Sequence, residues 1–600
     1  METWEAWLTV IVAGSLLVCL AMRVAATDLL ALLFLGVVML AQEISGSPLL
    51  PTAEEAVAGF GNKGLITVAL LFAVVAGLEF TGGTELATSW LLCKAKNVVD
   101  AKVRLLLPVA ALSGFLNNTP LVAALMPVVG DLSKRVSVNS SRLLLPLSYA
   151  AILGGMCTIM GTSTNLIIKD KYEQLNGNAM SFFEPAAVGI PAAIVGLLYI
   201  ILCSRWLLPE RQAAVSATDD PRQYTVEMEV SASGPLVGRT LKEAGLRHLP
   251  GLYVAEIQRA DGTIAPAKPT EILRGDDVLI LVGALDSVVD MRKIRGLTVP
   301  DGQARKLRVP SWQRTLVEAV VSSRCALLGK TIREGKFRSH YNAAVVAVAR
   351  GERRLTGKIG DVRLEVGDVL LLEASPSFLH RRRQSHDFFL VSTVEKGEVR
   401  RPELAWLSLA VMLAMVIAAT LSPVSIMTAA LIAAIAMIVL RCCSAAEARR
   451  SIDWSVLIVI GAAIGIGQAL EQSGAADAIA NGLLSIAGGG NLRSLAAIFI
   501  ATMICTELIT NNAAAVLMFT IAVTTAGQLG VDPAPFVIAV MIAASASFLT
   551  PVGYQTNTMV YGVGGYRFSD YLRFGLPLSA IVFAVSMVII PQVWPFTPTL

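Results

Sequence analysis

The chain has 600 residues, of which 54% are hydrophobic and only 16% are charged. Soluble globular proteins carry about 25% charged residues, so the composition excludes a chain that is soluble throughout and favours one that spans a membrane. The net charge of +4 indicates no particular partner, and no nucleic acid is expected.

The first membrane part covers residues 1–209, where long apolar runs dominate. Runs such as Trp7–Met22 and Leu29–Ala41 are long enough to enter or cross a bilayer. Glu2 and Glu5 precede the first run, where a signal peptide would carry basic residues. We therefore expect this run to be a spanning helix.

Two polar segments interrupt the apolar runs of this first part. Residues 113–120 read SGFLNNTP, and Gly161–Asn165 reads GTSTN. Apolar stretches too short to span separately flank the first segment, and also residues 506–513 (TELITNNA) of the second membrane part, which predicts a re-entrant hairpin at each. The second predicts a broken helix near the bilayer midplane. Irregular backbone survives in hydrocarbon only where it lines a protein cavity, so both segments are candidate sites.

Residues 210–401 have the composition of a soluble protein, and basic residues such as Arg211 and Arg401 flank them. The positive-inside rule therefore predicts that this insert lies in the cytoplasm. We expect the membrane parts to lie in the inner cell membrane. The insert is itself duplicated at an offset of 91, as in Asp277–Leu279 and Asp368–Leu370. We expect two tandem α/β modules, at residues 218–300 and 311–395.

The second membrane part, residues 402–600, repeats the first. Gly161–Asn165 matches Gly553–Asn557 at an offset of 392, and Asn117-Asn118 matches Asn511-Asn512 at 394. Both parts join the insert on one side of the membrane, so halves with an odd number of crossings would be inverted. The predicted fold is an all-α polytopic membrane protein, an inverted-repeat transporter with re-entrant hairpins, broken helices and a soluble α/β insert.

The chemistry of these interruptions favours ion binding. An asparagine carbonyl can coordinate Na⁺, while its amide and the N–H groups of a following helix can hold an anion. One such site would more often be polar packing between helices; four sites related by a repeat favour function. The candidate substrate-binding residues are Asn117, Asn118, Thr119, Ser163, Thr164, Asn165, Asn511, Asn512, Thr556, Asn557 and Thr558. The candidate cation-binding residues are Ser113, Asn118, Gly161, Glu507, Thr510, Asn512 and Gly553.

Other residues of the membrane parts are weaker indications of a functional site. Glu79 and Glu471 match across the repeat, and each precedes a glycine, which predicts helix ends. The eight cysteines form no CxxC pair and the four histidines all lie in the insert, so no disulfide framework, zinc site or other metal site beyond Na⁺ is expected. No nucleophile–base constellation is evident, so we expect neither an enzyme nor a cofactor.

At these residues the chain resembles the divalent anion:sodium symporter family, whose hairpin tips carry Ser-Asn-Thr. The matching residues are Asn117-Asn118-Thr119 and Asn511-Asn512-Ala513. Asn117 and Asn511 stand where the family has serine, and Ala513 stands where it has threonine. The insert resembles a tandem of TrkA-C-type subdomains of potassium-conductance regulators (RCK C-terminal domains), and the combination resembles the sulfate-permease-like branch.

The resemblance implies Na⁺ at each hairpin tip and neighbouring broken helix, with an anion between the tips. It also implies a homodimer and an elevator-like movement. The leading hypothesis is Na⁺-coupled uptake of a small divalent oxyanion, with sulfate expected. The alternatives are uptake of a C4-dicarboxylate or citrate, arsenite efflux, an anion sensor, or a regulated potassium channel. Thr550–Gln555 resembles a potassium filter, but Pro551 interrupts that pattern. The insert would bind an unknown small ligand or serve dimerisation.

Overall fold

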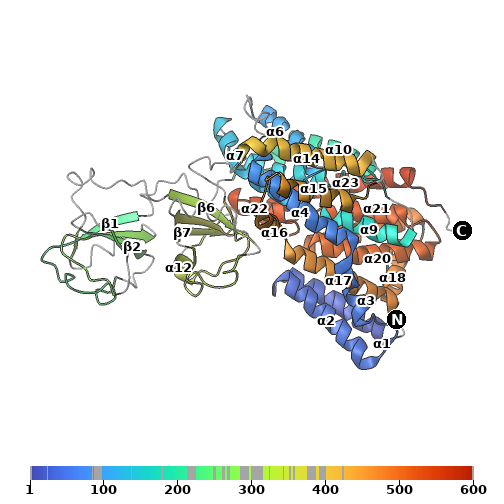
Figure 1. Cartoon of the computed structure of the whole chain (residues 1–600), viewed down its shortest axis with the longest axis horizontal. Coiled ribbons are helices and arrows are strands. Elements are labelled where there is room, and N and C mark those ends of the chain that lie inside the picture. Colours follow the sequence, from blue (N-terminus) through green and yellow to red (C-terminus); the bar gives the residue numbers. More distant parts are fainter. Residues whose placement is uncertain are drawn as a thin grey trace. The chain divides into compact units, whose positions relative to one another are not determined.

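The computed structural model divides the chain into two units. It describes residues 3–22, 24–83, 86, 97–136, 138–176, 180–211, 225–246, 252–259, 264–266, 270–283, 296–298, 315–322, 325–341, 343–350, 353–355, 359–374, 387–390, 401–421 and 424–597. One unit comprises Met1–Glu210, Glu398–Val560 and Phe568–Leu600, and the other comprises Arg211–Gly397 with Tyr561–Arg567. Figure 1 shows that helices make up the first unit and that the strands belong to the second.

The first unit contains two series of helices. The first series is α1 (Trp4–Ala21), α2 (Thr27–Ser45), α3 (Ala53–Ala58), η1 (Gly59–Gly61), α4 (Lys63–Thr81), α6 (Val98–Ser113), α7 (Asn118–Arg135), α8 (Ser141–Gly155), α9 (Ser163–Asn176) and α10 (Ala186–Leu207). The second series is η6 (Pro402–Leu404), α14 (Ala405–Leu421), α15 (Ile426–Val439), α16 (Ala445–Ser451), α17 (Trp454–Gln472), α18 (Ala475–Ala487), α19 (Asn491–Leu508), α20 (Asn511–Leu529), α21 (Ala534–Ser545), α22 (Gln555–Val563) and α23 (Phe568–Val593).

Seven segments of the described chain are long and apolar enough to cross a membrane. They are the helices α2, α10, α17, α19, α20 and α23, and the segment Ala53–Thr81, which ends with α4. The expectation that the stretches beside the second Asn pair are too short to span is therefore wrong, since α19 has 18 residues and α20 has 19. The error arose because Thr506, Glu507 and Asn511 make these helices look interrupted, although regular helix continues up to Leu508 and resumes at Asn511.

Helices α4 and α17 show how the repeat is built into local structure. Each has 19 residues, and each begins at a side-chain cap, Asn62 for α4 and Asp453 for α17. The glycines Gly82 and Gly474 follow their ends with φ of 73° and 74°, a left-handed conformation that glycine adopts without steric cost. Glu79 and Glu471 lie in the last turns of these helices, so the prediction that both mark helix ends is confirmed.

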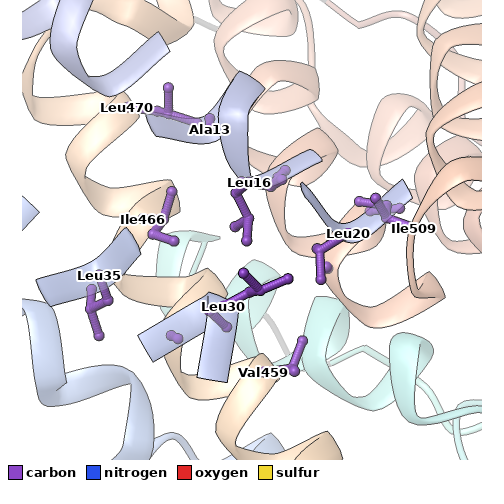
Figure 2. Packing of buried hydrophobic residues seen from close by; sticks show 14 of the residues in the cluster. Ala13, Leu16, Leu20, Leu30, Leu35, Val459, Ile466, Leu470 and Ile509 are labelled. Carbon is purple, nitrogen blue, oxygen red and sulfur yellow. The ribbon is translucent and has the colours of Figure 1, made fainter. Parts of the chain in front are cut away.

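Apolar packing joins the N-terminal helices to the second series. Figure 2 shows Leu16 and Leu20 of α1 and Leu30 of α2 converging on α17 and on Ile509, which lies between α19 and α20. Small residues at this surface, including Gly465 of α17, allow close approach: a Cβ atom there would lie 2.3 Å from the carbonyl oxygen of Ala56. The helices that bracket the second Asn pair are therefore held by helices from the opposite end of the chain.

The second unit contains two five-stranded antiparallel sheets with the same strand order. The strands are β1 (Thr225–Val230), β2 (Leu252–Gln258), β3 (Ile264–Pro266), β4 (Val278–Gly283), β5 (Leu297–Thr298), β6 (Thr315–Val321), β7 (Ala343–Arg350), β8 (Arg353–Arg354), β9 (Val369–Ala374) and β10 (Phe388–Leu390), with the short helices α12 (Phe337–Tyr341) and η5 (Ile359–Asp361). The orders β3-β2-β4-β1-β5 and β10-β6-β9-β7-β8 become identical when one is reversed and its strands are renumbered by five.

Each module has the same ion-paired strand end. In the first, Arg259 contacts Asp277 at 2.6 Å, and in the second Arg350 contacts Asp368 at 2.8 Å. A glutamate near each helix-like turn also repeats, since Glu243 and Glu334 accept the backbone N–H of Thr240 and Thr331. These hydrogen bonds lower the pKa of both carboxyl groups below their ordinary value. The duplication seen at an offset of 91 therefore extends from the fold to individual polar contacts.

Candidate functional site

The candidate residues lie at four interruptions between helices of the first unit. We define the first tip as residues 113–119, between α6 and α7, and the second tip as residues 506–512, between α19 and α20. The first break is residues 156–162, between α8 and α9, and the second break is residues 546–554, between α21 and α22. Each interruption is followed by a helix whose first N–H groups have no partner within the helix.

The first tip is tied to the second break. Ser113 donates to the side-chain oxygen of Asn118 and, at 2.6 Å, to the carbonyl of Ala151 in α8. Asn118 is fully buried, and its amide nitrogen donates to the Tyr554 hydroxyl at 2.7 Å. Thr119 donates to the side-chain oxygen of Gln555, the first residue of α22, at 3.0 Å. The first tip therefore contacts the interrupted helix of the other half.

The second tip makes the reciprocal contacts. Thr506 donates to the side-chain oxygen of Asn511 at 3.0 Å and to the carbonyl of Ala544 in α21 at 2.7 Å. The side-chain oxygen of Asn512 accepts a hydrogen bond from Ser163, the first residue of α9, at 2.8 Å. Each half thus presents its tip to the break of the other, although the residues are about 350 to 440 positions apart in the chain.

These contacts correct the register in which the two tips were aligned. Ser113, Asn118 and Ala151 make the same hydrogen bonds as Thr506, Asn511 and Ala544, and every pair is separated by 393 residues. The counterpart of Asn117-Asn118-Thr119 is therefore Thr510-Asn511-Asn512, and the alignment at 394 is wrong by one residue. The sequence comparison selected it because it superimposes two identical Asn-Asn pairs.

In this register the second tip contains a hydroxyl group. Ala513 was expected to replace the family threonine and to remove a hydroxyl, but Ala513 lies inside α20 and is buried among apolar residues. A hydroxyl is present at the tip in Thr510, at the position of Asn117. Asn512 takes the position of Thr119, since both contact the first residue of the helix that follows the opposite break.

The breaks hold the other two candidate asparagines, which are both fully buried. Asn165 donates to the carbonyl of Thr158 at 2.9 Å, and Asn557 donates to the carbonyls of Ser547 and Thr550 at 3.0 and 3.2 Å. These bonds fold each helix start back onto its own break. The amide nitrogens are therefore used for structure, and the side-chain oxygens are the groups left to contact other partners.

Buried hydroxyl groups link each break to a helix of the opposite half. Ser148 of α8 donates to Thr556 at 2.8 Å and to the side-chain oxygen of Asn557 at 2.7 Å. Thr164 lies 3.1 Å from the hydroxyl of Ser545, the last residue of α21. The sequence analysis missed Ser148, Ser545 and Tyr554. A lone serine in an apolar helix carries no signal, because the same pattern is common in ordinary helix packing.

Thr558 differs from the other candidates. Its hydroxyl donates to the carbonyl of Pro551 at 2.6 Å, and this bond lies within its own half. Among the described contacts, this residue does not join the two halves. Its assignment as a substrate ligand remains a prediction with less geometric support than that of Asn118 or Ser163.

A small cavity lies beside the first tip. Its volume is about 30 Å³, enough for roughly two water molecules. One wall is apolar and comes mainly from α4, and the other carries the polar groups of the tip and break. The lining residues are Val68, Leu71, Phe72, Val75, Phe115, Asn117, Met160, Gly161, Ser163 and Leu166.

Several buried oxygen atoms at this site have no partner with hydrogen-bond geometry. They include Asn165 Oδ1 in the first half, and Glu507 Oε2, Thr510 Oγ1 and Ser547 Oγ in the second. Buried polar atoms are almost always paired in folded proteins, so such atoms mark places where an ion, a water molecule or a ligand would bind. All four are oxygens, which are the ligands that hard cations prefer.

Hydrogen bonds bring the two tips and the two breaks together at one site. Comparison with known proteins shows the family to which the chain belongs. A family model described as citrate transporter matches residues 17–530 and 470–596. A protein of Chlamydomonas reinhardtii named "Putative sulfur deprivation response regulator" is 37% identical over 90% of this chain and 94% of its own length.

Two further relatives are named as transporters. An uncharacterized transporter of Synechocystis sp. is 32% identical, with 92% of each chain covered. Sodium/sulfate cotransporter 1 of Chlamydomonas reinhardtii is 28% identical over 89% of this chain and 84% of its own. These matches and the seven candidate spans identify a multi-pass integral membrane protein that is a transporter rather than an enzyme. The chain belongs to the citrate transporter family, which agrees with the expected relationship to the divalent anion:sodium symporters.

Proposed function

We propose that this protein is a secondary active transporter that couples uptake of a small divalent oxyanion, sulfate in the first place, to Na⁺ by alternating access. The observation that carries the proposal is the reciprocal contact of tips and breaks. Asn118 with Tyr554, and Asn512 with Ser163, bring amide and hydroxyl groups of both halves to one site. Sodium/sulfate cotransporters among the relatives support this choice of ions.

The cations would occupy the oxygen-rich side of each tip. In the first half the proposed ligands are Ser113, Asn118 and Gly161. In the second half they are Glu507, Thr510, Asn512 and Gly553, and the side chain of Asn511 joins them because it is the counterpart of Asn118. Unpaired oxygens of Glu507 and Thr510 favour a cation here, because an ion would satisfy them at once.

The anion would lie between the tips, without a positively charged side chain beside it. The tips and breaks contain no lysine or arginine. Its charge would be met by the N-terminal N–H groups of α7, α9, α20 and α22, by hydroxyl and amide groups, and by the bound cations. Anion binding that depends on bound cations provides coupling, because neither ion is bound well alone.

A substrate-panel uptake assay tests the proposal. The purified protein in proteoliposomes would receive labelled sulfate under an imposed Na⁺ gradient, an imposed H⁺ gradient, or neither. We expect uptake that the Na⁺ gradient accelerates and that excess unlabelled sulfate abolishes. Sulfate flux that is the same with and without a Na⁺ gradient would contradict sodium coupling.

Two other functions have a specific finding in their favour. The description of the matching family model favours citrate or a C4-dicarboxylate as the substrate. Competition of sulfate uptake by succinate or citrate would reveal it. The name of the regulator from Chlamydomonas reinhardtii favours an anion sensor. Sulfate binding without flux in the same proteoliposomes would identify that case. From the resemblance of the insert to TrkA-C-type subdomains we also propose a homodimer and a small-molecule ligand for the insert.

A further inference from the structure

The two tips differ at a position that the corrected register makes visible. Thr158 donates to the carbonyl oxygen of Gly114, and its counterpart Thr550 donates to the carbonyl oxygen of Glu507 at 3.5 Å. Glu507 is therefore the counterpart of Gly114. The first tip has no side chain where the second tip has a carboxylate, which is only 8% exposed.

A second glycine of the first half, Gly155, also has a counterpart with a side chain, Ser547, at an offset of 392. Both residues lie against a glycine that the two halves share, Gly161 in the first and Gly553 in the second. A Cβ atom on Gly161 would lie 2.5 Å from the carbonyl oxygen of Gly155 and 2.8 Å from that of Ser113. A Cβ atom on Gly553 would lie 2.2 Å from Ser547 Oγ, 2.8 Å from Glu507 Oε2 and 3.1 Å from the carbonyl oxygen of Thr506. Ser547 thus supplies a hydroxyl where Gly155 supplies only backbone.

The second half therefore has a cluster of oxygens around the bare face of Gly553. Glu507 Oε1 is anchored by the N–H of Leu549 at 2.7 Å, while Oε2 faces the cluster and makes no hydrogen bond of good geometry. Ser547 Oγ is fully buried beside this carboxylate and interacts with it, again without a hydrogen bond of good geometry. A carboxylate buried without a compensating positive charge is strongly unfavourable, whereas a cation among three oxygens removes that penalty.

We propose that the two cation sites are unequal: the second half binds Na⁺ with a fixed negative charge from Glu507 and an added ligand from Ser547, and the first half binds it with neutral oxygens only. The inference rests on the proposed sodium coupling, which it deepens. The second site fills at a lower Na⁺ concentration, since an opposite charge in a poorly hydrated site adds attraction that dipoles alone do not supply. Loading is then ordered, with the second site first.

The test measures Na⁺ binding without any transported anion. Full-length protein in detergent would be titrated with NaCl against choline chloride at constant ionic strength, and thermal stabilisation would report binding to the folded state. In Glu507→Gln, which keeps the shape and removes the charge, we expect the Na⁺ concentration for half-maximal stabilisation to rise at least about tenfold. Ser547→Ala should raise it by a smaller factor, and Glu54→Gln, at an exposed position in α3, should leave it unchanged.

Wild-type Na⁺ dependence in both Glu507→Gln and Ser547→Ala would overturn the inference, as would wild-type protein that Na⁺ does not stabilise. If Glu507→Gln does not fold, Ser547→Ala decides alone. Sulfate uptake is measured separately in proteoliposomes. Absent sulfate uptake with the expected Na⁺ shifts would reject the proposed substrate and keep the unequal sites. Normal Na⁺-driven sulfate uptake without these shifts would reject the unequal sites and keep the proposed substrate.

Discussion

The first and second tips have the same hydrogen-bonded framework and different chemistry. Ser113 and Thr506 each bind an asparagine five residues on and a carbonyl of a neighbouring helix. Around this framework the first tip has Gly114 where the second has Glu507. The bonds that hold the backbone are the same in both tips, while the side chains that face the unpaired oxygens differ. Framework and ion chemistry can therefore be tested apart.

The largest expected effect comes from the framework asparagines. Asn118→Ala removes the partner of the Tyr554 hydroxyl, and Asn511→Ala removes one of the two acceptors of Thr506. Loss of a buried hydrogen-bond partner costs about 1–3 kcal/mol, and the lost amide oxygens are proposed ion ligands. We expect each variant to reduce Na⁺-driven sulfate uptake at least about tenfold. Uptake relative to protein in the liposome measures it, with the exposed Asn481→Ala as control. Wild-type uptake in either variant would break the equivalence of the tips.

The two glycines facing the tips should differ in stability when each gains a methyl group. In Gly161→Ala the new Cβ meets backbone of Gly155, which cannot move aside, and overpacking of this kind costs about 1–3 kcal/mol. In Gly553→Ala it meets side-chain atoms, which can rotate. We expect the larger loss in Gly161→Ala, measured as unfolding temperature in detergent.

The same pair of variants has an internal check. Adding Ser547→Ala to Gly553→Ala removes the nearest atom, at 2.2 Å, and should restore part of the unfolding temperature. The matched change in the first half is impossible, since Gly155 has no side chain to remove. Equal losses in both glycine variants, with no relief from Ser547→Ala, would show that the two breaks are packed alike.

The contacts between halves form the third test. Thr119→Val removes the bond to Gln555, and Ser163→Ala removes the bond to Asn512. Each bond contributes about 0.5–1.5 kcal/mol, so the double variant should lose about the sum of the single effects if the two contacts act independently. Unfolding temperatures of the two single variants and the double variant measure this, with Ser181→Ala, at an exposed position, as control. A double variant no worse than one single variant would indicate that the contacts form a coupled unit.

The smallest effect should follow Tyr554→Phe, which removes only the hydroxyl that accepts from Asn118. One hydrogen bond of about 0.5–1.5 kcal/mol corresponds to a change of a few-fold, so we expect a moderate loss of uptake. The kinetics of sulfate uptake measure it, and a loss as large as that of Asn118→Ala would mean that Asn118 acts mainly by holding Tyr554. The corresponding residue of the first break is Thr162, whose hydroxyl lies 2.7 Å from that of Thr164, and none of its described hydrogen bonds reaches the second tip.

Much of the candidate site was predictable from the sequence, because lipid leaves few places for polar, irregular backbone. Asn118, Asn165, Asn512 and Asn557 all lie at helix interruptions, as expected. Ser148 and Ser545 could not be found in this way. Each is a single hydroxyl in an apolar helix, and its role depends on which break of the other half it faces.

The sequence by itself determined the two membrane halves, the interruptions in their helices and the doubled insert, because hydropathy, helix-ending glycines and repeat offsets are local properties that need no knowledge of packing. Only the tertiary structure decided that Asn118 corresponds to Asn511, that each tip meets the opposite break, and that Glu507 and Ser547 face the same bare glycine. These facts depend on contacts that form only in the folded chain, within each half for the register and for Glu507 and Ser547, and between the halves for the tips and breaks. A shift of one residue at a tip leaves the composition unchanged while it exchanges every partner.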